Sequence, residues 1–182
     1  MSLPLPPPEL FADVFVLRAI EDADWRVEQD LSRDPDVVRW TLYPEAMTEA
    51  QARARVTRSQ RRAAEGMVQR YVIWDGAVAL GTCGLGRLDQ PTPDAFYALL
   101  PFARGRGAAT HALQGLFHWV ALSGRPGLEV TTVTGNVASE GVARRAGFHV
   151  HHTQPGEHRG ETTVLHTWLR IVDGAITPSP ST

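Results

Sequence analysis

A short glycine-rich loop stands between an apolar segment and an amphipathic helical pattern, at Arg104–Ala109 (Arg-Gly-Arg-Gly-Ala-Ala). The first N–H groups of a helix have no acceptor inside the helix, and the helix dipole places positive charge beside them. Small residues let a bulky anion approach these N–H groups, and arginine side chains add charge-assisted hydrogen bonds. The segment therefore predicts a phosphate or pyrophosphate site.

Two other nucleotide loops fit this segment less well. A Walker-type loop ends in Gly-Lys-Ser/Thr, and the chain contains no lysine. A dinucleotide fingerprint needs a third small residue where Thr110 stands, and it follows the first strand of a parallel sheet. The remaining alternative is a glycine-rich turn that only starts a helix.

A second motif follows the loop, because residues 130–150 contain Asn-x-x-Ser and then Gly-Phe. The loop itself matches the pattern Arg/Gln-x-x-Gly-x-Gly/Ala. The residues that meet the two patterns are Arg104, Gly107, Ala109, Asn136, Ser139, Gly147 and Phe148. Together they resemble the GNAT acyltransferases, and most closely the branch of ribosomal-protein N-terminal acetyltransferases. The resemblance extends over residues 13–171 and includes the pair Leu17-Arg18 and the hairpin at Asp75-Gly76.

The resemblance implies a cofactor, acetyl-CoA, and a place for it. In the family, the strand before the loop and the next strand splay apart, and the pantetheine arm lies in the gap along the main chain of the earlier strand. The cofactor-binding residues expected on this basis are Ala98, Leu99, Leu100, Arg104, Gly105, Arg106, Gly107, Ala108, Ala109, Asn136 and Ser139.

The reaction that the resemblance implies is direct transfer of an acetyl group to a primary amine. It needs a base for the ammonium and a proton donor for the thiolate, and backbone N–H groups would stabilise the oxyanion. Many relatives place a tyrosine eight residues after the asparagine, where this chain has Arg144. Members of the resembled branch use the serine of Asn-x-x-Ser instead, so the resemblance implies Ser139 as the proton donor; the alternative is a helix-terminus hydroxyl. Glu157, in the loop before the last strand, is the expected base, its alternative being a solvated carboxylate.

Weaker candidates surround these two residues. Asp94 and Glu45 are reserve bases, and His111 stands where relatives commonly have glutamate. Aromatic side chains next to a carboxylate suit an amine, which favours residues 39–49 as the acceptor side, although packing explains them nearly as well. The segment contains the aromatic residues Trp40 and Tyr43, followed by Pro44 and the carboxylate of Glu45.

The acceptor stays open between a protein N-terminus and a small-molecule amine, because acceptor pockets are built from variable loops. Two other functions compete with acetyl transfer. One is a GNAT-fold sensor or scaffold that binds CoA without turnover, and the other is a dinucleotide enzyme that prefers NAD. A homodimer is expected on family grounds only.

Three features are interpreted as structural. His149, His151 and His152 alternate on a predicted strand, but no cysteine or acidic partner stands at a metal-ligand spacing, so we expect no metal. Cys83 lies among apolar residues, which is typical of a buried, inert thiol. The arginine-rich helix predicted after Thr48 is most simply a solvated face.

The elements that position these residues follow from periodicity and turn signals. Strands and helices alternate as β, α, α, three strands, α, β, α and two strands, which predicts a mixed α/β fold with helices on both faces of one sheet. With the resemblance, the fold class is a single GNAT domain with a mostly antiparallel sheet splayed at its fourth and fifth strands. We expect a flexible proline-rich segment at 1–12, the domain at 13–172 and a flexible tail at 173–182.

Composition excludes several classes of function. The chain has 182 residues and a formal net charge of −2, which argues against a general nucleic-acid binder. A single cysteine excludes an internal disulfide framework and fits a reducing compartment. No apolar run is long enough to span a membrane, and the N-terminus does not resemble a secretory signal. The expected location is the cytoplasm.

Overall fold

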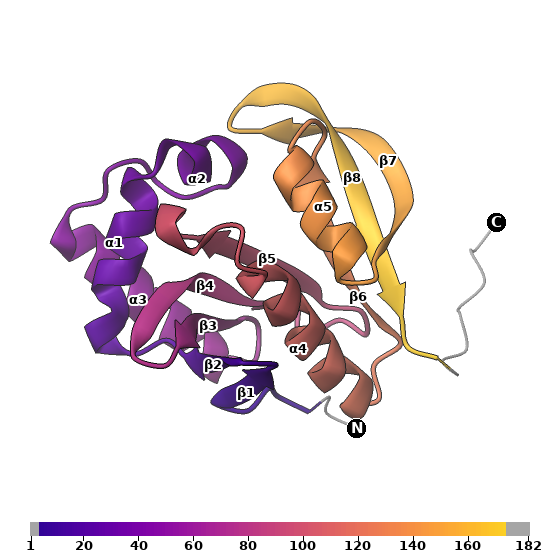
Figure 1. The fold of residues 1–182 in the computed structure, drawn as a ribbon, viewed down its shortest axis with the longest axis horizontal. Helices are drawn as coiled ribbons and strands as arrows, with labels where there is room; N and C mark the ends of the chain where they lie inside the picture. Colours follow the sequence, from indigo (N-terminus) through magenta and orange to yellow (C-terminus); the bar gives the residue numbers. More distant parts are fainter. Residues whose placement is uncertain (1–3, 174–182) are drawn as a thin grey trace.

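A computed structural model describes residues 4–173 of the chain, with one twisted sheet and helices on both of its faces (Figure 1). The strands are β1 (Glu9–Ala12), β2 (Phe15–Ala19), β3 (Gln69–Asp75), β4 (Val78–Gly86), β5 (Asp94–Leu99), β6 (Gly127–Val133), β7 (His149–His158) and β8 (Glu161–Ile171). The helices are α1 (Trp25–Arg33), α2 (Pro35–Trp40), α3 (Glu49–Ala64), α4 (Ala108–Leu122) and α5 (Val137–Arg145). Short 3-10 turns lie at Asp22–Asp24 and Pro101–Ala103.

The sheet has the strand order β1-β2-β3-β4-β5-β6-β8-β7, and its strand pairs are antiparallel except β5 with β6. The parallel pairing is limited to Asp94 with Glu129 and Ala95 with Val130. Beyond Ala95 the two strands separate, while β5 stays paired with β4 as far as Leu99. The predicted mixed, mostly antiparallel and splayed sheet is confirmed.

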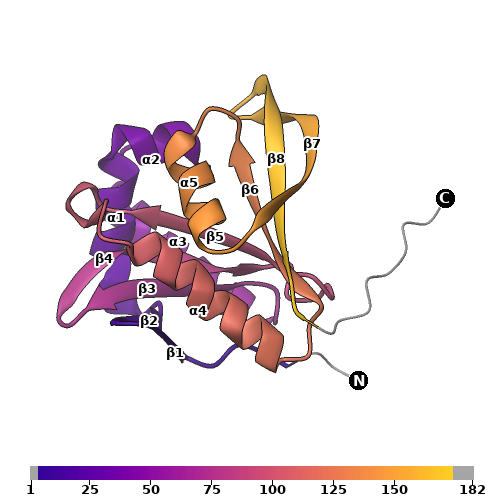
Figure 2. The same cartoon turned by 45° about the vertical axis from the view of Figure 1, so that its right-hand side comes forward.

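Helices lie on both faces of the sheet (Figure 2), and two hydrophobic cores hold them there. Leu113 and Leu116 of α4 pack on one face in a core that also contains Phe148 and Trp168. On the other face, α1 and α3 pack in a second core that contains Val56. Burial of apolar surface on both faces is what a sheet of this kind requires, and the predicted helices on both faces are confirmed.

The N-terminal segment differs from the expectation of a flexible region over residues 1–12. Residues 9–12 form β1, with Leu10 opposite Leu17 of β2. The hydroxyl of Tyr71 donates a hydrogen bond of 2.8 Å to the carbonyl of Pro7. The prolines remove N–H donors but leave carbonyls available, so this segment still joins the edge of the sheet.

Two further elements differ in extent. Helix α2 was not predicted, although Asp34 caps it by accepting from the N–H of Val37 and Pro35 occupies its first turn. Strand β7 includes Glu157, which was expected in a loop; Pro155 does not interrupt the strand, because β7 lies at the edge of the sheet, where a missing N–H is tolerated.

The expected tail at 173–182 lies, apart from Asp173, outside the described residues. Between residues 4 and 173, no helix combines the length and the apolar character that a membrane crossing needs.

Candidate active site

The glycine-rich loop forms the entry to α4, and its two glycines are required by the backbone. Gly105 has φ +75° and Gly107 has φ +80°, a region that other residues adopt at a cost. Gly107 is the N-cap of α4. A Cβ at Gly107 would stand 3.2 Å from the ring of His111, whereas one at Gly105 would meet nothing within 4 Å.

The main-chain N–H groups of residues 105–110 are the polar feature of this loop. Within the described part of the chain, none of these N–H groups donates to a protein acceptor, and the first bond inside α4 runs from His111 N to Gly107 O at 3.0 Å. The side chains of Ala108 and Ala109 are buried, which fixes the first turn against the sheet. A run of free N–H groups at a helix N-terminus is suited to a pyrophosphate.

The two arginines of the loop are paired with carboxylates. Arg104 contacts Asp34 at 2.6 Å and Asp36 at 3.1 Å, and Arg106 contacts Asp75. Burial alone would raise the pKa of Asp34, but the hydrogen bonds from Arg104 and from backbone N–H groups hold it below its ordinary value. Both guanidinium groups are thus engaged by carboxylates, and the expected role of Arg104 and Arg106 in binding the cofactor stays a prediction.

Strand β5 presents one main-chain edge to the gap left by β6. Leu100 N already donates to Leu80 O of β4 at 2.9 Å. Successive residues of a strand direct their N–H and C=O groups to opposite sides, so the N–H and C=O groups of Leu99 point away from β4. The Leu99 carbonyl accepts a hydrogen bond from Arg104 at 3.3 Å. Of Ala98, Leu99 and Leu100, the three residues expected to bind the cofactor, Leu99 is thus the one whose main-chain groups face the gap. Ala98 and Leu100 are buried.

The start of α5 forms the opposite side of the gap. The side chain of Asn136 caps the helix by accepting from Ser139 N at 3.2 Å, as expected for a capping asparagine. The hydroxyl of Tyr97 on β5 reaches the carbonyl of Ser139 at 3.5 Å, and burial raises the pKa of Tyr97 to about 12. Tyr97 was not singled out as a site residue, although it shares a strand face with Leu99. The cofactor-binding residues predicted on the loop, β5 and α5 therefore lie on the elements that flank the separation of β5 from β6.

The predicted base and its alternatives lie on separate elements, β7, β5 and α4. Glu157 is an exposed residue near the end of β7, opposite Thr162, and not in a loop as expected. Asp94 pairs with β6 where the two strands are still joined, and its carboxylate contacts Arg87 at 3.0 Å. His111 packs against the ring of Phe15 beside β2, away from the gap.

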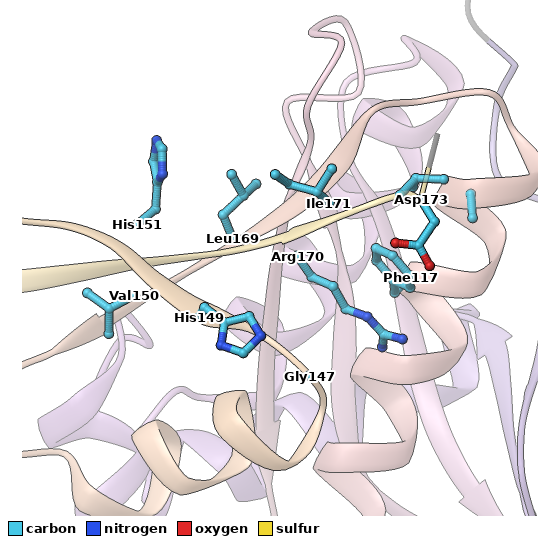
Figure 3. Close-up of a pocket in the computed structure, with 11 residues that line it drawn as sticks. Phe117, Gly147, His149, Val150, His151, Leu169, Arg170, Ile171 and Asp173 are labelled. Atoms are coloured by element: carbon cyan, nitrogen blue, oxygen red, sulfur yellow. The ribbon is translucent and has the colours of Figure 1, made fainter. Parts of the chain in front are cut away.

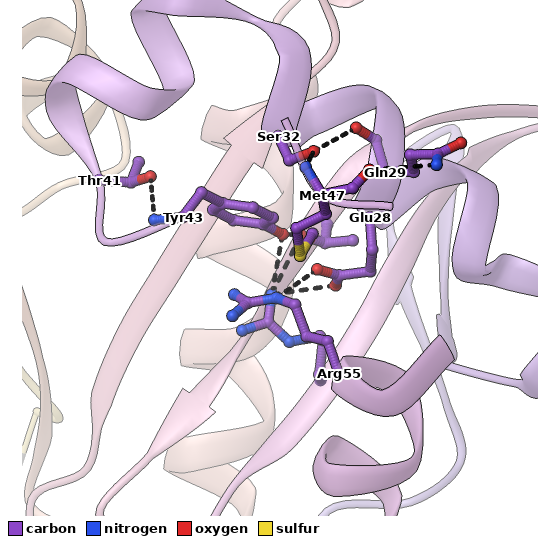
Figure 4. Close-up of polar contacts among 9 residues, drawn as sticks. Glu28, Gln29, Ser32, Thr41, Tyr43, Met47 and Arg55 are labelled. Carbon is purple, nitrogen blue, oxygen red and sulfur yellow. Dashed lines mark hydrogen bonds and ion pairs between the residues drawn. The ribbon is translucent and has the colours of Figure 1, made fainter. Parts of the chain in front are cut away.

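Most residues of the segment expected to bind the acceptor are exposed or partly exposed, but Tyr43 lies in a buried polar network (Figure 4). Tyr43 is 5% exposed, and its hydroxyl lies 2.8 Å from Thr82 Oγ1 and 3.1 Å from Arg70. Glu28 is 0% exposed and accepts from Arg55 at 2.6 Å. Burial and the neighbouring carboxylate raise the pKa of Tyr43. This network holds the α2–α3 connection on β4, while Glu45 remains exposed.

A groove of about 610 Å³ lies at the other end of α4 (Figure 3). Arg170 stacks on Phe117 at 3.9 Å and donates to the carbonyl of Ala146 at 2.7 Å. His149 and His151 line this groove. Among the described residues, no three His, Cys, Asp or Glu side chains form a group that could hold a metal ion. Cys83 is buried, as expected, and burial raises the pKa of its thiol.

The family model described as an acetyltransferase (GNAT) domain matches residues 15–149. The chain belongs to this family. In this GNAT domain Arg144 stands at the position of the missing tyrosine; it is exposed on α5, contacts Glu140 at 3.3 Å and lies 5.5 Å from the ring of Trp168.

Solved acetyltransferases share this fold over nearly their whole length. RimL, a ribosomal L7/L12 alpha-N-protein acetyltransferase in complex with CoA, has a TM-score of 0.79 at 19% identity over 94% of this chain and 98% of its own. The microcin C7 self-immunity acetyltransferase MccE, in complex with acetyl-CoA and AMP, has a TM-score of 0.82 at 15% identity over 94% and 99%.

A Salmonella typhimurium acetyl transferase that modifies the N-terminal serine of ribosomal protein L7/L12 has a TM-score of 0.77 at 19% identity over 94% and 99%. No protein of curated function matches the sequence.

Proposed function

We propose that this GNAT acetyltransferase domain uses acetyl-CoA to acetylate a primary amine, either a protein N-terminus or an amine of a small molecule. The observation that carries the proposal is the run of free N–H groups at residues 105–110, placed beside the gap where β5 and β6 separate. RimL and MccE, which share the fold, are described with CoA and acetyl-CoA. The RimL description of an N-terminal acceptor supports the same class of amine here.

The residues present fit acetyl-CoA. The N–H groups of 105–110 would hold the pyrophosphate, and the Leu99 main chain would bond the pantetheine arm. When bound, this cofactor supplies an acetyl group on a thioester. The loop N–H groups would be the main donors to the phosphates, because Arg104 and Arg106 are engaged by Asp34 and Asp75.

The chain's own groups handle the protons in this proposal. Glu157 takes a proton from the acceptor ammonium, directly or through water, before the amine nitrogen attacks the thioester carbonyl. As the C–N bond forms and the C–S bond breaks, the Ser139 hydroxyl donates a proton to the departing thiolate and regains one, through water, from the nitrogen of the new amide. A main-chain N–H at the splay, with Leu99 the best placed, stabilises the oxyanion.

A CoA-binding protein without turnover is the second candidate. It is favoured by the exposed setting of Glu157 and by Arg144 at the position of the usual tyrosine. It predicts that CoA binds and that no amine is acetylated.

Thermal unfolding with acetyl-CoA, CoA and NAD, followed by thiol release with a panel of amines, separates these functions. A ligand at a hundredfold its Kd stabilises the folded state by about 2.7 kcal/mol. A shift with CoA species but not NAD, together with amine-dependent thiol release, supports the proposal. A shift without thiol release supports the second candidate, and no shift with CoA or acetyl-CoA contradicts both.

A further inference from the structure

The tip of the β7–β8 hairpin contacts the connection between α2 and α3, which belongs to the other half of the sheet (Figure 1). His158 Nε2 donates to the carbonyl of Arg39 at 2.8 Å. Arg159 Nη1 donates to the carbonyls of Thr41 at 3.2 Å and Tyr43 at 3.0 Å. These bonds join segments that are 116 to 119 residues apart in sequence.

The bonds span the two halves of the molecule beyond the point where the sheet opens. Pairing between β5 and β6 ends at Ala95, so the sheet itself does not hold the halves together toward the loop end. The α2–α3 connection carries the exposed Glu45, and β7 carries Glu157 two residues before Arg159. The hairpin contact therefore places the two segments expected to face the acceptor at a defined position relative to each other.

The backbone at the hairpin tip gives an independent reason to single out Arg159. Arg159 has φ +54° and Gly160 has φ +82°. Two-residue turns with positive φ at both central positions favour asparagine, aspartate or glycine at the first of them. The turn thus holds an arginine at a conformational cost. The guanidinium group of this arginine donates the hydrogen bonds to the carbonyls of Thr41 and Tyr43.

Tyr43 connects this contact to the core. Its carbonyl accepts from Arg159, while its side chain lies in the buried network with Thr82 and Arg70. A displacement of the α2–α3 connection at this point is opposed from both sides, by the hairpin and by the β4 surface.

We propose that Arg159 is a positioning residue for the acceptor: its guanidinium group clamps the α2–α3 connection to the β7–β8 hairpin, so that the connection and Glu157 form two walls of one acceptor entrance. The inference rests on the proposed function, because it assumes an amine acceptor. It adds a residue that acts through the position of other groups and does not itself touch the reacting atoms.

The test separates the guanidinium group from the turn. Arg159→Asn removes the guanidinium group and places a turn-favoured residue at φ +54°, so the variant is expected to unfold at the same temperature as the wild type or above it. Arg159→Lys keeps a charged donor. Glu161→Gln is the matched control, because Glu161 is an exposed neighbour on the same hairpin.

Five quantities are measured on the full chain: the unfolding temperature, the Kd for CoA, KM and kcat with the amine that the wild type acetylates fastest, and hydrogen exchange of residues 39–47. For Arg159→Asn we expect KM to rise at least tenfold, equivalent to about 1.4 kcal/mol. The Kd for CoA stays unchanged, and exchange in residues 39–47 becomes faster. Arg159→Lys restores part of the KM, and Glu161→Gln behaves as the wild type.

Three results would overturn the clamp. They are an unchanged KM in Arg159→Asn, a loss of CoA affinity as large as the rise in KM, and unchanged hydrogen exchange. If the wild type acetylates no amine, the proposed function fails, and the exchange measurement alone decides the clamp: faster exchange supports it and unchanged exchange refutes it.

Discussion

A substitution at Gly105 tests the N–H loop most directly, because the structure supplies a matched position. Gly105 has φ +75° and Gly124, just after α4, has φ +74°, and a Cβ at either position would meet nothing within 4 Å. Alanine in this left-handed region costs about 1–2 kcal/mol. Gly105→Ala and Gly124→Ala should therefore lower the free energy of unfolding by the same amount, which urea unfolding measures.

The two variants should differ in binding. In Gly105→Ala the methyl group projects from the loop, and the backbone strain turns N–H groups away from the phosphates. A hydrogen bond to a charged group contributes about 1.5–3 kcal/mol, so the loss of one such bond raises the Kd for CoA by about 10- to 100-fold. Titration calorimetry with CoA measures this Kd. Equal CoA affinities in the two variants would refute the role assigned to the loop.

Three further predictions concern charges and proton transfer. Arg104→Gln removes the ion-pair partner of Asp34, whose pKa is lowered in the folded state. In the wild type this carboxylate stabilises the fold above its unfolded-state pKa, and the stabilisation is lost as pH falls through the folded-state pKa. The free energy of unfolding of the variant, measured in urea between about pH 3 and 7, should therefore depend less on pH. Ser139→Ala should lower kcat for acetyl transfer by about 100-fold or more without changing the Kd for CoA, and an unchanged kcat would exclude the hydroxyl as proton donor. Glu28→Gln leaves Arg55 without its buried carboxylate and should destabilise the fold by about 3–5 kcal/mol, and a loss below about 1 kcal/mol would show that the ion pair is solvated.

Local sequence signals predicted most of the elements. The capping box at Thr48 starts α3, Asp75-Gly76 makes the hairpin between β3 and β4, and the apolar periodicity after Gly107 marks α4. These signals act within a few residues, so they are legible without a structure. The missed helix α2 had such a signal in Asp34-Pro35, whereas the length of β7 depended on its place at the edge of the sheet.

The candidate site divides in the same way. The glycines, the capping asparagine and the order of the two motifs are local properties, and by themselves they determined the anion loop, the resemblance to GNAT enzymes and the expected cofactor. Side-chain partners across the chain were not determined: the pairing of Arg104 with Asp34, the burial of Tyr43 and the contact of Arg159 with the α2–α3 connection all depend on the packing of distant segments. A backbone conformation is set mainly by adjacent residues. Ion pairs and hydrogen bonds between distant segments form only when the sheet brings those segments together, so the tertiary structure alone decided them.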